Sequence, residues 1–485
     1  MTRVRRRQFI AAAAGSGIGA TAGCNIPILG DDGSTSGQAG ATDWTQLRGT
    51  AGMTGHSRSG GPGPDASAQF TAEFRNGIHV GESAPLVGDD GIYGVGKVAE
   101  TYEMDPFTFG GYAFKCSRED GSEQWRTEIE TREGEDNFGF FRGPPTACLG
   151  PDGLYVTWAE QGDGFYRRHI ECRSREDGSK QWARQVDSAG SGHQPVIHGE
   201  TLFVLESGKL RAFSTDDGSD RWQTDEFLYY QLVPSVGRDI VAVYNQGFTG
   251  RDEDVTMQLT AFDRSDGSER WSVPLQRMRG FEQLPTVAGD TVYIAEGFGV
   301  GSLAATRREI PACSIRALDT SDGSERWSYT YAESGEGPTM AGGATSVAVD
   351  GDTVYAGLLY PTATQILGPD GSPDMYERLE EQVYAGRNLI AVDRADGSLQ
   401  WDAQVSTAAQ VWPYLVVDDT YLYAKYREPS DEETSPRTQW YVVEKSSGEI
   451  RDSFGSSVES DEFRAFGVAD GALYEHVGSG VRVWE

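Results

Sequence analysis

The chain has 485 residues, of which 74 are acidic and 42 basic, giving a formal net charge of −32. Only six of the basic residues are lysine, and the acids are scattered rather than gathered into one tail. This composition excludes a basic surface for nucleic acid. It is typical of proteins adapted to high salt, where counter-ions screen the repulsion between acids; an acidic patch for a cationic ligand is the alternative.

Residues 1–23 resemble a twin-arginine export signal that is absent from the mature protein. Arg6 and Arg7 correspond to the two arginines of such signals, directly before Gln8 and Phe9. The small, mildly apolar run over residues 11–22 is too short and too rich in alanine and glycine to span a bilayer stably. The N-terminus therefore predicts export from the cell.

The segment that follows the signal indicates a lipid anchor. Thr21-Ala22-Gly23-Cys24 resembles a lipobox, which implies lipidation of Cys24; a cleaved signal followed by an incidental cysteine is the alternative. Residues 24–43, rich in Gly, Ser and Asp, then form a flexible linker with an average reach of about 25 Å. We expect the protein on the outer face of the cell membrane, held there by lipid.

The sequence D-G-S-x-x-W occurs six times, and a seventh copy at residues 447–449 lacks the tryptophan. An alternating apolar and polar stretch precedes each copy, as in Leu210–Ser214, which is the period of a half-buried strand. Asp-Gly turns the chain, because glycine accepts the positive φ of a tight hairpin. The turn glycines are Gly121, Gly178, Gly218, Gly267, Gly323 and Gly397. On the returning strand we interpret the large ring as packing between neighbouring units. These blade-docking tryptophans are Trp125, Trp182, Trp222, Trp271, Trp327 and Trp401.

A second hairpin pattern lies upstream of each copy, as in residues 194–204 and 284–294, so each unit offers the four strands of a propeller blade. The pattern starts near Ala84, Pro145, Pro195, Pro234, Pro285, Ala344, Pro413 and Phe466. The last unit lacks its outer strand, which Gln69–Phe74 could supply and so remove the open sheet edges. We predict that residues 44–485 form an all-β, eight-bladed β-propeller of four-stranded antiparallel blades, closed by N- and C-terminal strands; seven blades is the alternative.

Four insertions fall between the second and third strands of their blades, and we expect them to emerge on one face, where repeat proteins commonly bind partners. They are Val98–Gly111, Gly297–Ala312, Pro361–Arg387 and Glu428–Arg437.

The units at residues 261–271 and 391–401, which read A-x-D-x-x-D-G-S-x-x-W, resemble the repeats of the pyrroloquinoline quinone (PQQ)-like propeller superfamily. Residues 44–55 resemble its W-x-x-x-R-G-x-x-x-x-T-G opening. The resemblance implies the fold but no single activity, because the superfamily joins enzymes with non-catalytic scaffolds. Its exported lipoprotein branch, in a haloarchaeal setting, implies a surface-anchored scaffold for unknown protein partners. A PQQ- and calcium-dependent dehydrogenase of alcohols or sugars is the alternative.

Candidate chemistry outside the repeat is sparse. Cys116 could form a disulfide with Cys148 or Cys172 across adjacent blades, or all three could be buried thiols. No C-x-x-C motif and no vicinal cysteine pair occurs, and the six histidines form no metal motif. The Asp-rich turns lack the ligand spacing of an EF-hand, and their adjoining Asp and Gly differ from a sialidase-type Asp-box. We expect no catalytic or metal-binding residues and no cofactor, with PQQ and calcium as the alternative.

Overall fold

The computed structural model describes residues 46, 48–50, 53–73, 79–80, 85–99, 108–133, 145–161, 166–188, 194–206, 208–225, 233–247, 256–275, 284–296, 314–331, 343–344, 347–359, 388–405, 414–428, 437–456, 466–477 and 480–485. All of them belong to one compact unit, Asp31–Glu485. Arg6, Arg7, Cys24 and the linker lie outside the described residues. None of the described residues belongs to a helix that is long and apolar enough to cross a membrane.

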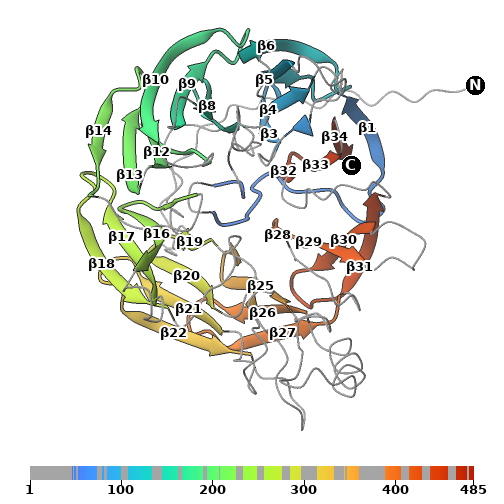
Figure 1. Ribbon diagram of the computed structural model, residues 1–485. Helices are drawn as coiled ribbons and strands as arrows, with labels where there is room; N and C mark the ends of the chain where they lie inside the picture. Colours follow the sequence, from blue (N-terminus) through green and yellow to red (C-terminus); the bar gives the residue numbers. More distant parts are fainter. Residues whose placement is uncertain are drawn as a thin grey trace, which may run out of the picture. The chain divides into compact units, whose positions relative to one another are not determined.

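These residues form eight antiparallel sheets arranged as the blades of a ring, and they contain no helix (Figure 1). The prediction of an eight-bladed β-propeller is confirmed. The strands of blades 1 and 2 are β2 (His79–Val80), β3 (Leu86–Gly88), β4 (Gly91–Ala99), β5 (Thr108–Cys116) and β6 (Glu123–Glu133), then β7 (Thr146–Leu149), β8 (Leu154–Gln161), β9 (Tyr166–Arg173) and β10 (Lys180–Ser188). Those of blades 3 and 4 are β11 (Val196–His198), β12 (Thr201–Glu206), β13 (Lys209–Ser214) and β14 (Asp220–Gln223), then β15 (Ser235–Val236), β16 (Ile240–Gly247), β17 (Thr256–Asp263) and β18 (Glu269–Pro274).

The remaining blades follow the same order. Blades 5 and 6 contain β19 (Thr286–Ala288), β20 (Thr291–Glu296), β21 (Ser314–Asp319) and β22 (Glu325–Thr330), then β23 (Gly343–Ala344), β24 (Ala348–Asp350), β25 (Thr353–Leu359), β26 (Leu389–Asp393) and β27 (Leu399–Ala403). Blades 7 and 8 contain β28 (Tyr414–Val417), β29 (Tyr421–Glu428), β30 (Arg437–Glu444) and β31 (Ile450–Ser456), then β32 (Phe466–Ala469), β33 (Ala472–Val477), β34 (Gly480–Trp484) and β1 (Ala68–Glu73).

The ring closes through β1, which pairs antiparallel with β34 as the outer strand of blade 8. The sequence predicted this strand at Gln69–Phe74, one residue further along the chain. Two backbone hydrogen bonds between Ser67 and Glu485 extend the pairing. Strands from both ends of the domain therefore complete one blade and close the ring.

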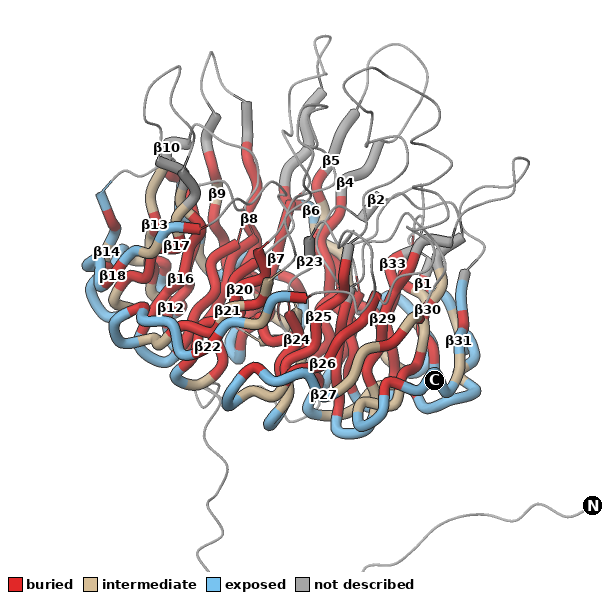
Figure 2. Tube along the Cα trace, turned by 90° about the horizontal axis from the view of Figure 1, so that it is seen from below, coloured by how far each residue is buried: buried red, intermediate tan, exposed pale blue. Residues whose placement is uncertain are grey.

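The turns between the first and second strands and between the third and fourth strands lie on one face, which we call the turn face. Antiparallel succession places the other strand ends on the opposite face. The four predicted insertions are flanked by strand ends on that opposite face, and most of their residues lie outside the described part. The first insertion is shorter than predicted, because β4 runs to Ala99 and β5 begins at Thr108. Exposed residues gather along the turn face, and the strands above it are buried (Figure 2).

The hydrophobic core consists of layers between adjacent blades. One layer joins Tyr293 and Ile315 of blade 5 to Val354 and Val392 of blade 6, and every other pair of neighbours shares a comparable layer. Each blade therefore buries the apolar side chains of both its faces. Stability depends on how firmly each blade docks on the next.

Candidate functional site: the blade seams and the axis of the ring

The polar groups of the Asp-Gly-Ser turns form hydrogen bonds with one another inside each turn. Gly323 has a φ of 73°, and its N–H donates to the Asp319 carbonyl at 2.9 Å. The Asp322 carboxylate accepts the Ser324 N–H at 2.9 Å, and hydrogen bonds from this serine lower the pKa of Asp322. Five residues separate β21 from β22, and a bulge shifts the register of the pair. These aspartates are satisfied within the turn, so hairpin geometry accounts for their recurrence.

Each repeat tryptophan contacts the turn of the next blade. A Cβ placed on Gly323 would lie 2.7 Å from Trp271 Cε3, so only glycine allows this approach. The indole Nε1 donates to the carbonyl three residues before the turn glycine of the next blade. The six bonds are Trp125 to Arg175 at 3.0 Å, Trp182 to Thr215 at 2.9 Å, Trp222 to Arg264 at 3.0 Å, Trp271 to Thr320 at 2.9 Å, Trp327 to Arg394 at 2.8 Å and Trp401 to Lys445 at 2.9 Å.

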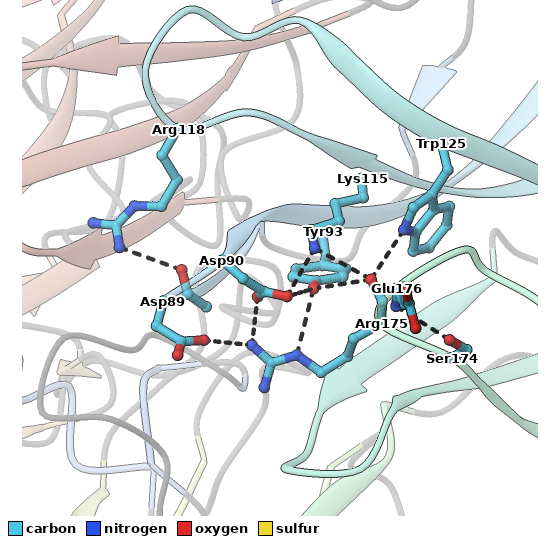
Figure 3. A network of polar contacts seen from close by, with 10 residues as sticks. Asp89, Asp90, Tyr93, Lys115, Arg118, Trp125, Ser174, Arg175 and Glu176 are labelled. Carbon is cyan, nitrogen blue, oxygen red and sulfur yellow. Dashed lines mark hydrogen bonds and ion pairs between the residues drawn. The ribbon is translucent and has the colours of Figure 1, made fainter.

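The residue that supplies this carbonyl has a second function that the sequence reasoning missed. Where it is basic, its side chain reaches back into the preceding blade. Arg175 of blade 2 donates to Asp89 and Asp90 of blade 1 at 2.7 and 2.5 Å (Figure 3). Arg394 of blade 6 donates to the Tyr293 hydroxyl of blade 5 at 2.9 Å. The signal was available: Arg, Lys or Thr stands at this place in every copy.

The Asp90 carboxylate lies at the centre of the cluster in Figure 3. It accepts from Lys115 Nζ and the Tyr93 hydroxyl at 2.7 Å each, besides Arg175. Burial alone would raise the pKa of Asp90, but the hydrogen bonds from Arg175, Lys115 and Tyr93 hold it at about 2. The cluster joins the first hairpin of blade 1 to the turn of blade 2, so its charges are matched across a seam rather than offered to a ligand.

The described residues of the opening motif, 46, 48–50 and 53–55, together with residues 56–61, form what we call the axial segment. It crosses the middle of the ring (Figure 1), and its backbone bonds to Val349 and Val417 place it at the turn-face ends of the innermost strands. Gln46 exchanges two hydrogen bonds with Ile197 of blade 3, at 2.9 and 2.7 Å. Thr54 O accepts the Val349 N–H of blade 6 at 2.9 Å, and Ser57 Oγ donates to Val468 O of blade 8 at 3.0 Å. The segment thus ties together inner strands that are far apart in the sequence.

The residue types of the motif follow from this geometry. Arg48 Nη2 donates to Val347 O at 2.5 Å and Nη1 to Thr286 Oγ1 at 3.4 Å, so one side chain joins blades 5 and 6. Burial lowers the pKa of Arg48 to about 10. Gly55 has a φ of 64°, and a Cβ there would lie 3.0 Å from Leu415 O. The motif therefore joins inner strands of different blades at the axis of the ring, and no local sequence pattern predicts these partners.

The seam between blades 7 and 8 lacks the tryptophan dock, since Asp452 stands in its place. A buried charge cluster is found there. Lys425 Nζ lies 3.0 Å from Glu475 Oε1, and the two side chains are 2% and 1% exposed. The same carboxylate accepts from the indoles of Trp440 at 3.1 Å and Trp484 at 3.2 Å. The sequence does contain a signal for this cluster, because Glu475 places a charge at a strand position that belongs to the hydrophobic core.

The described cysteines and histidines do not gather into a metal site. Cys116, Cys148 and Cys172 are buried free thiols, and burial raises the pKa of Cys116 and Cys172 to about 12. The disulfide proposed between Cys116 and Cys148 or Cys172 is therefore not formed, and the alternative of buried thiols holds. His198 Nδ1 lies 2.7 Å from Arg264 Nη1, and His169 stacks on Trp158. Cys313 lies outside the described residues.

The described residues assemble no calcium site of the kind that the alternative prediction requires. Calcium takes six to eight oxygen ligands, and no three His, Cys, Asp or Glu side chains gather into a possible metal site in the part of the chain that the structure describes. At the axis, the donors of Arg48 bond to a backbone carbonyl and a threonine hydroxyl. We derive no catalytic step through PQQ.

Comparison with known proteins identifies the family of this chain. The family described as outer membrane protein assembly factor BamB matches residues 113–226 and 230–424, more than half of the chain. No curated protein matches significantly. Among solved structures, BamB from Moraxella catarrhalis is 13% identical, with 87% of this chain and 99% of that one covered and a TM-score of 0.49.

Two enzymes are also similar. The quinohemoprotein alcohol dehydrogenase ADHIIG from Pseudomonas putida HK5 is 17% identical, over 55% of this chain and 42% of that one, with a TM-score of 0.34. The quinohemoprotein alcohol dehydrogenase from Comamonas testosteroni is 12% identical, over 92% and 81%, with a TM-score of 0.39. At these values none of the three structures indicates an activity or a partner for this chain.

Proposed function

The chain belongs to the family of the outer membrane protein assembly factor BamB, and from this premise we propose that it is a non-catalytic scaffold that binds other proteins. The observation that supports the proposal is the use of the recurring residues. The turn aspartates bond to their own serines, the tryptophans to the next blade and the opening motif to the axis. The residues that make this chain resemble a quinoprotein therefore build the ring, and its outer surfaces are available for partners.

The proposed location is the outer face of the cell membrane. Arg6 and Arg7 support export by a twin-arginine route, and Cys24 supports a lipid anchor ahead of the flexible linker. The net charge of −32 supports a high-salt, haloarchaeal setting. In that setting the partners would be proteins of the cell surface.

Two measurements test the function. Chemical cross-linking on intact cells, followed by mass spectrometry, should give reproducible protein neighbours; their absence would refute the scaffold. Titration of the purified protein with PQQ and calcium should give neither saturable binding nor dye-coupled oxidation of alcohols or sugars. Saturable binding with turnover would refute the non-catalytic proposal.

The anchor is tested separately with the Cys24→Ser variant. We expect this variant to appear in the medium rather than on the cells, with the same thermal unfolding as the wild-type propeller. Full retention of Cys24→Ser on washed cells would refute the lipid anchor and leave the protein-binding function untouched.

A further inference from the structure

Blade 8 differs from the other seven blades in how its two outermost strands are joined. In blades 1 to 7 the third and fourth strands follow one another in the chain and are linked by a turn. In blade 8 the neighbouring strands β34 and β1 come from opposite ends of the domain and are joined by hydrogen bonds, including the two between Ser67 and Glu485 (Figure 1). A tryptophan of blade 7 would therefore find no Asp-Gly-Ser turn among the described residues of blade 8.

The seam between blades 7 and 8 has a different contact at the place of the tryptophan dock. Asp452 stands at the tryptophan position of β31, and its carboxylate accepts the Asp65 N–H at 2.6 Å. In blades 1, 2, 5 and 6 the tyrosine of the second strand packs on the docked indole. In blade 7 that tyrosine is Tyr423, whose hydroxyl donates to Pro62 O at 2.8 Å and whose ring leaves no room for a Cβ on Gly61. Residues ahead of β1 thus contact the groups that an indole contacts elsewhere.

The seam between blades 8 and 1 also depends on the N-terminal strand. Phe70 of β1 stands at the tryptophan position of blade 8, and a Cβ on Gly121 would lie 2.9 Å from Phe70 Cδ2. The phenyl ring therefore packs on the turn of blade 1 as the tryptophans pack on theirs. It has no N–H to donate, so this seam lacks the indole hydrogen bond that the six seams from blade 1 to blade 7 contain.

The segment that serves both seams of blade 8 is weakly held, and we call its residues 62–73 the latch. Of residues 62–72, only Pro62 and Ala72 are buried. Asp65 has a φ of 72°, a left-handed conformation that is unfavourable for a residue other than glycine. Segments with few buried apolar side chains and exposed backbone hydrogen bonds open at lower free energy than the core of a fold. The latch has these properties at the one place where the sheet is joined without a turn.

We propose that the latch is a releasable strap, through which the ring opens at blade 8 while the other blades stay joined. Its release breaks the Asp65 hydrogen bond, the Phe70 dock and the pairing of β1 with β34 together, because all three belong to one short stretch of chain. Blades 1 to 7 remain joined by their six tryptophan docks. The edge of β34 is then free to pair with another strand. The inference concerns the fold and is independent of the proposed protein-binding function.

Amide hydrogen exchange of the purified full chain, resolved to single residues, tests the proposal. The amides that bond β34 to β1 are compared with those that bond β17 to β18, the third and fourth strands of blade 4. We expect exchange about tenfold faster or more in β34. Asp452→Ala should accelerate exchange in β34 about fivefold further and leave β17 unchanged. The control Asp322→Ala removes an aspartate bond to an N–H in the turn of blade 5 and should leave β34 unchanged.

A covalent staple gives the second measurement and decides the matter alone if Asp452→Ala does not fold. Ser67 and Glu485 exchange both backbone hydrogen bonds, and Cα atoms of such antiparallel neighbours lie within the span of a disulfide. In the Ser67→Cys/Glu485→Cys variant, oxidation should slow exchange in β34 by about tenfold or more, and a reductant should restore it. Equal rates in β34 and β17, an oxidised variant that exchanges as fast as the reduced one, or acceleration of all eight blades by Asp452→Ala would overturn the proposal.

Discussion

Replacing Lys425 by methionine should reduce the free energy of unfolding by about 3–5 kcal/mol, because it leaves the Glu475 carboxylate buried without its cation. Lys425 and Glu475 lie 3.0 Å apart and are 2% and 1% exposed, so water cannot take the place of the lost partner. Glu475→Gln should cost about the same, since it leaves the ammonium group buried and uncompensated. Exposed Arg451 pairs with Glu449 at 3.1 Å, and Arg451→Met should cost only about 0–1 kcal/mol.

The double variant Lys425→Met/Glu475→Gln separates charge from packing. Positions 425 and 475 then carry no charge, and the glutamine carbonyl can still accept a hydrogen bond from an indole of Trp440 or Trp484. We expect a cost of about 1–3 kcal/mol for imperfect hydrogen bonds, well below the sum of the single variants. Denaturant unfolding of all four proteins at one high salt concentration measures this coupling. Additive single effects would refute the buried ion pair as the fastener of blades 7 and 8.

Three further outcomes are expected from the described contacts. Gly323→Ala and Gly471→Ala should each cost about 1–2 kcal/mol of folding free energy in backbone strain, because φ is 73° and 77° at these residues. Only Gly323→Ala should cost a further ~1–3 kcal/mol, because its methyl group would collide with Trp271. Equal shifts of the two melting temperatures would contradict the docking contact. The pKa of Asp90 is about 2, below its ordinary 3.8. The stabilisation that its carboxylate gives the fold is therefore complete above about pH 4 and is lost as the pH falls toward 2. Asp90→Asn should make the free energy of unfolding less dependent on pH in that window, as measured by denaturant unfolding at several pH values. Arg48→Met should accelerate amide exchange along the inner strands of blades 5 and 6 but not of blade 1, and uniform acceleration would argue against the axial segment as a local tie.

Local sequence patterns predicted most of the fold. The alternation before each turn located the third strands, and Leu210–Ser214 became part of β13 (Lys209–Ser214). The count of first hairpins gave eight blades, and Gln69–Phe74 was recognised as the closing strand within one residue. These features depend on residues close together in the sequence, which periodicity and turn chemistry describe well.

The contacts of the axial segment could not be predicted, because they join residues far apart in the sequence. Gln46 bonds to Ile197, 151 residues away, and nothing in either segment names its partner. Glu475 was overlooked because it lies in a strand with no repeat motif, although its charge at a core register was visible. Most of each predicted insertion lies outside the described residues, so the expectation that these loops bind partners stays a prediction.

A ring of equivalent blades would give a partner the same surface in every blade, and repetition alone therefore cannot specify where a partner binds. The departures from the repeat are concentrated in blades 6 to 8. Leu399 and Ile450 replace charges, Asp452 replaces a docking tryptophan and accepts the Asp65 N–H at 2.6 Å, and Glu475 replaces an apolar core residue. Asp452 removes the tryptophan contact between blades 7 and 8, and the buried ion pair of Lys425 and Glu475 joins the same two blades. Leu399 and Ile450 also make the surfaces of blades 6 and 7 chemically different from those of blades 1 to 5, which carry a charge at this place.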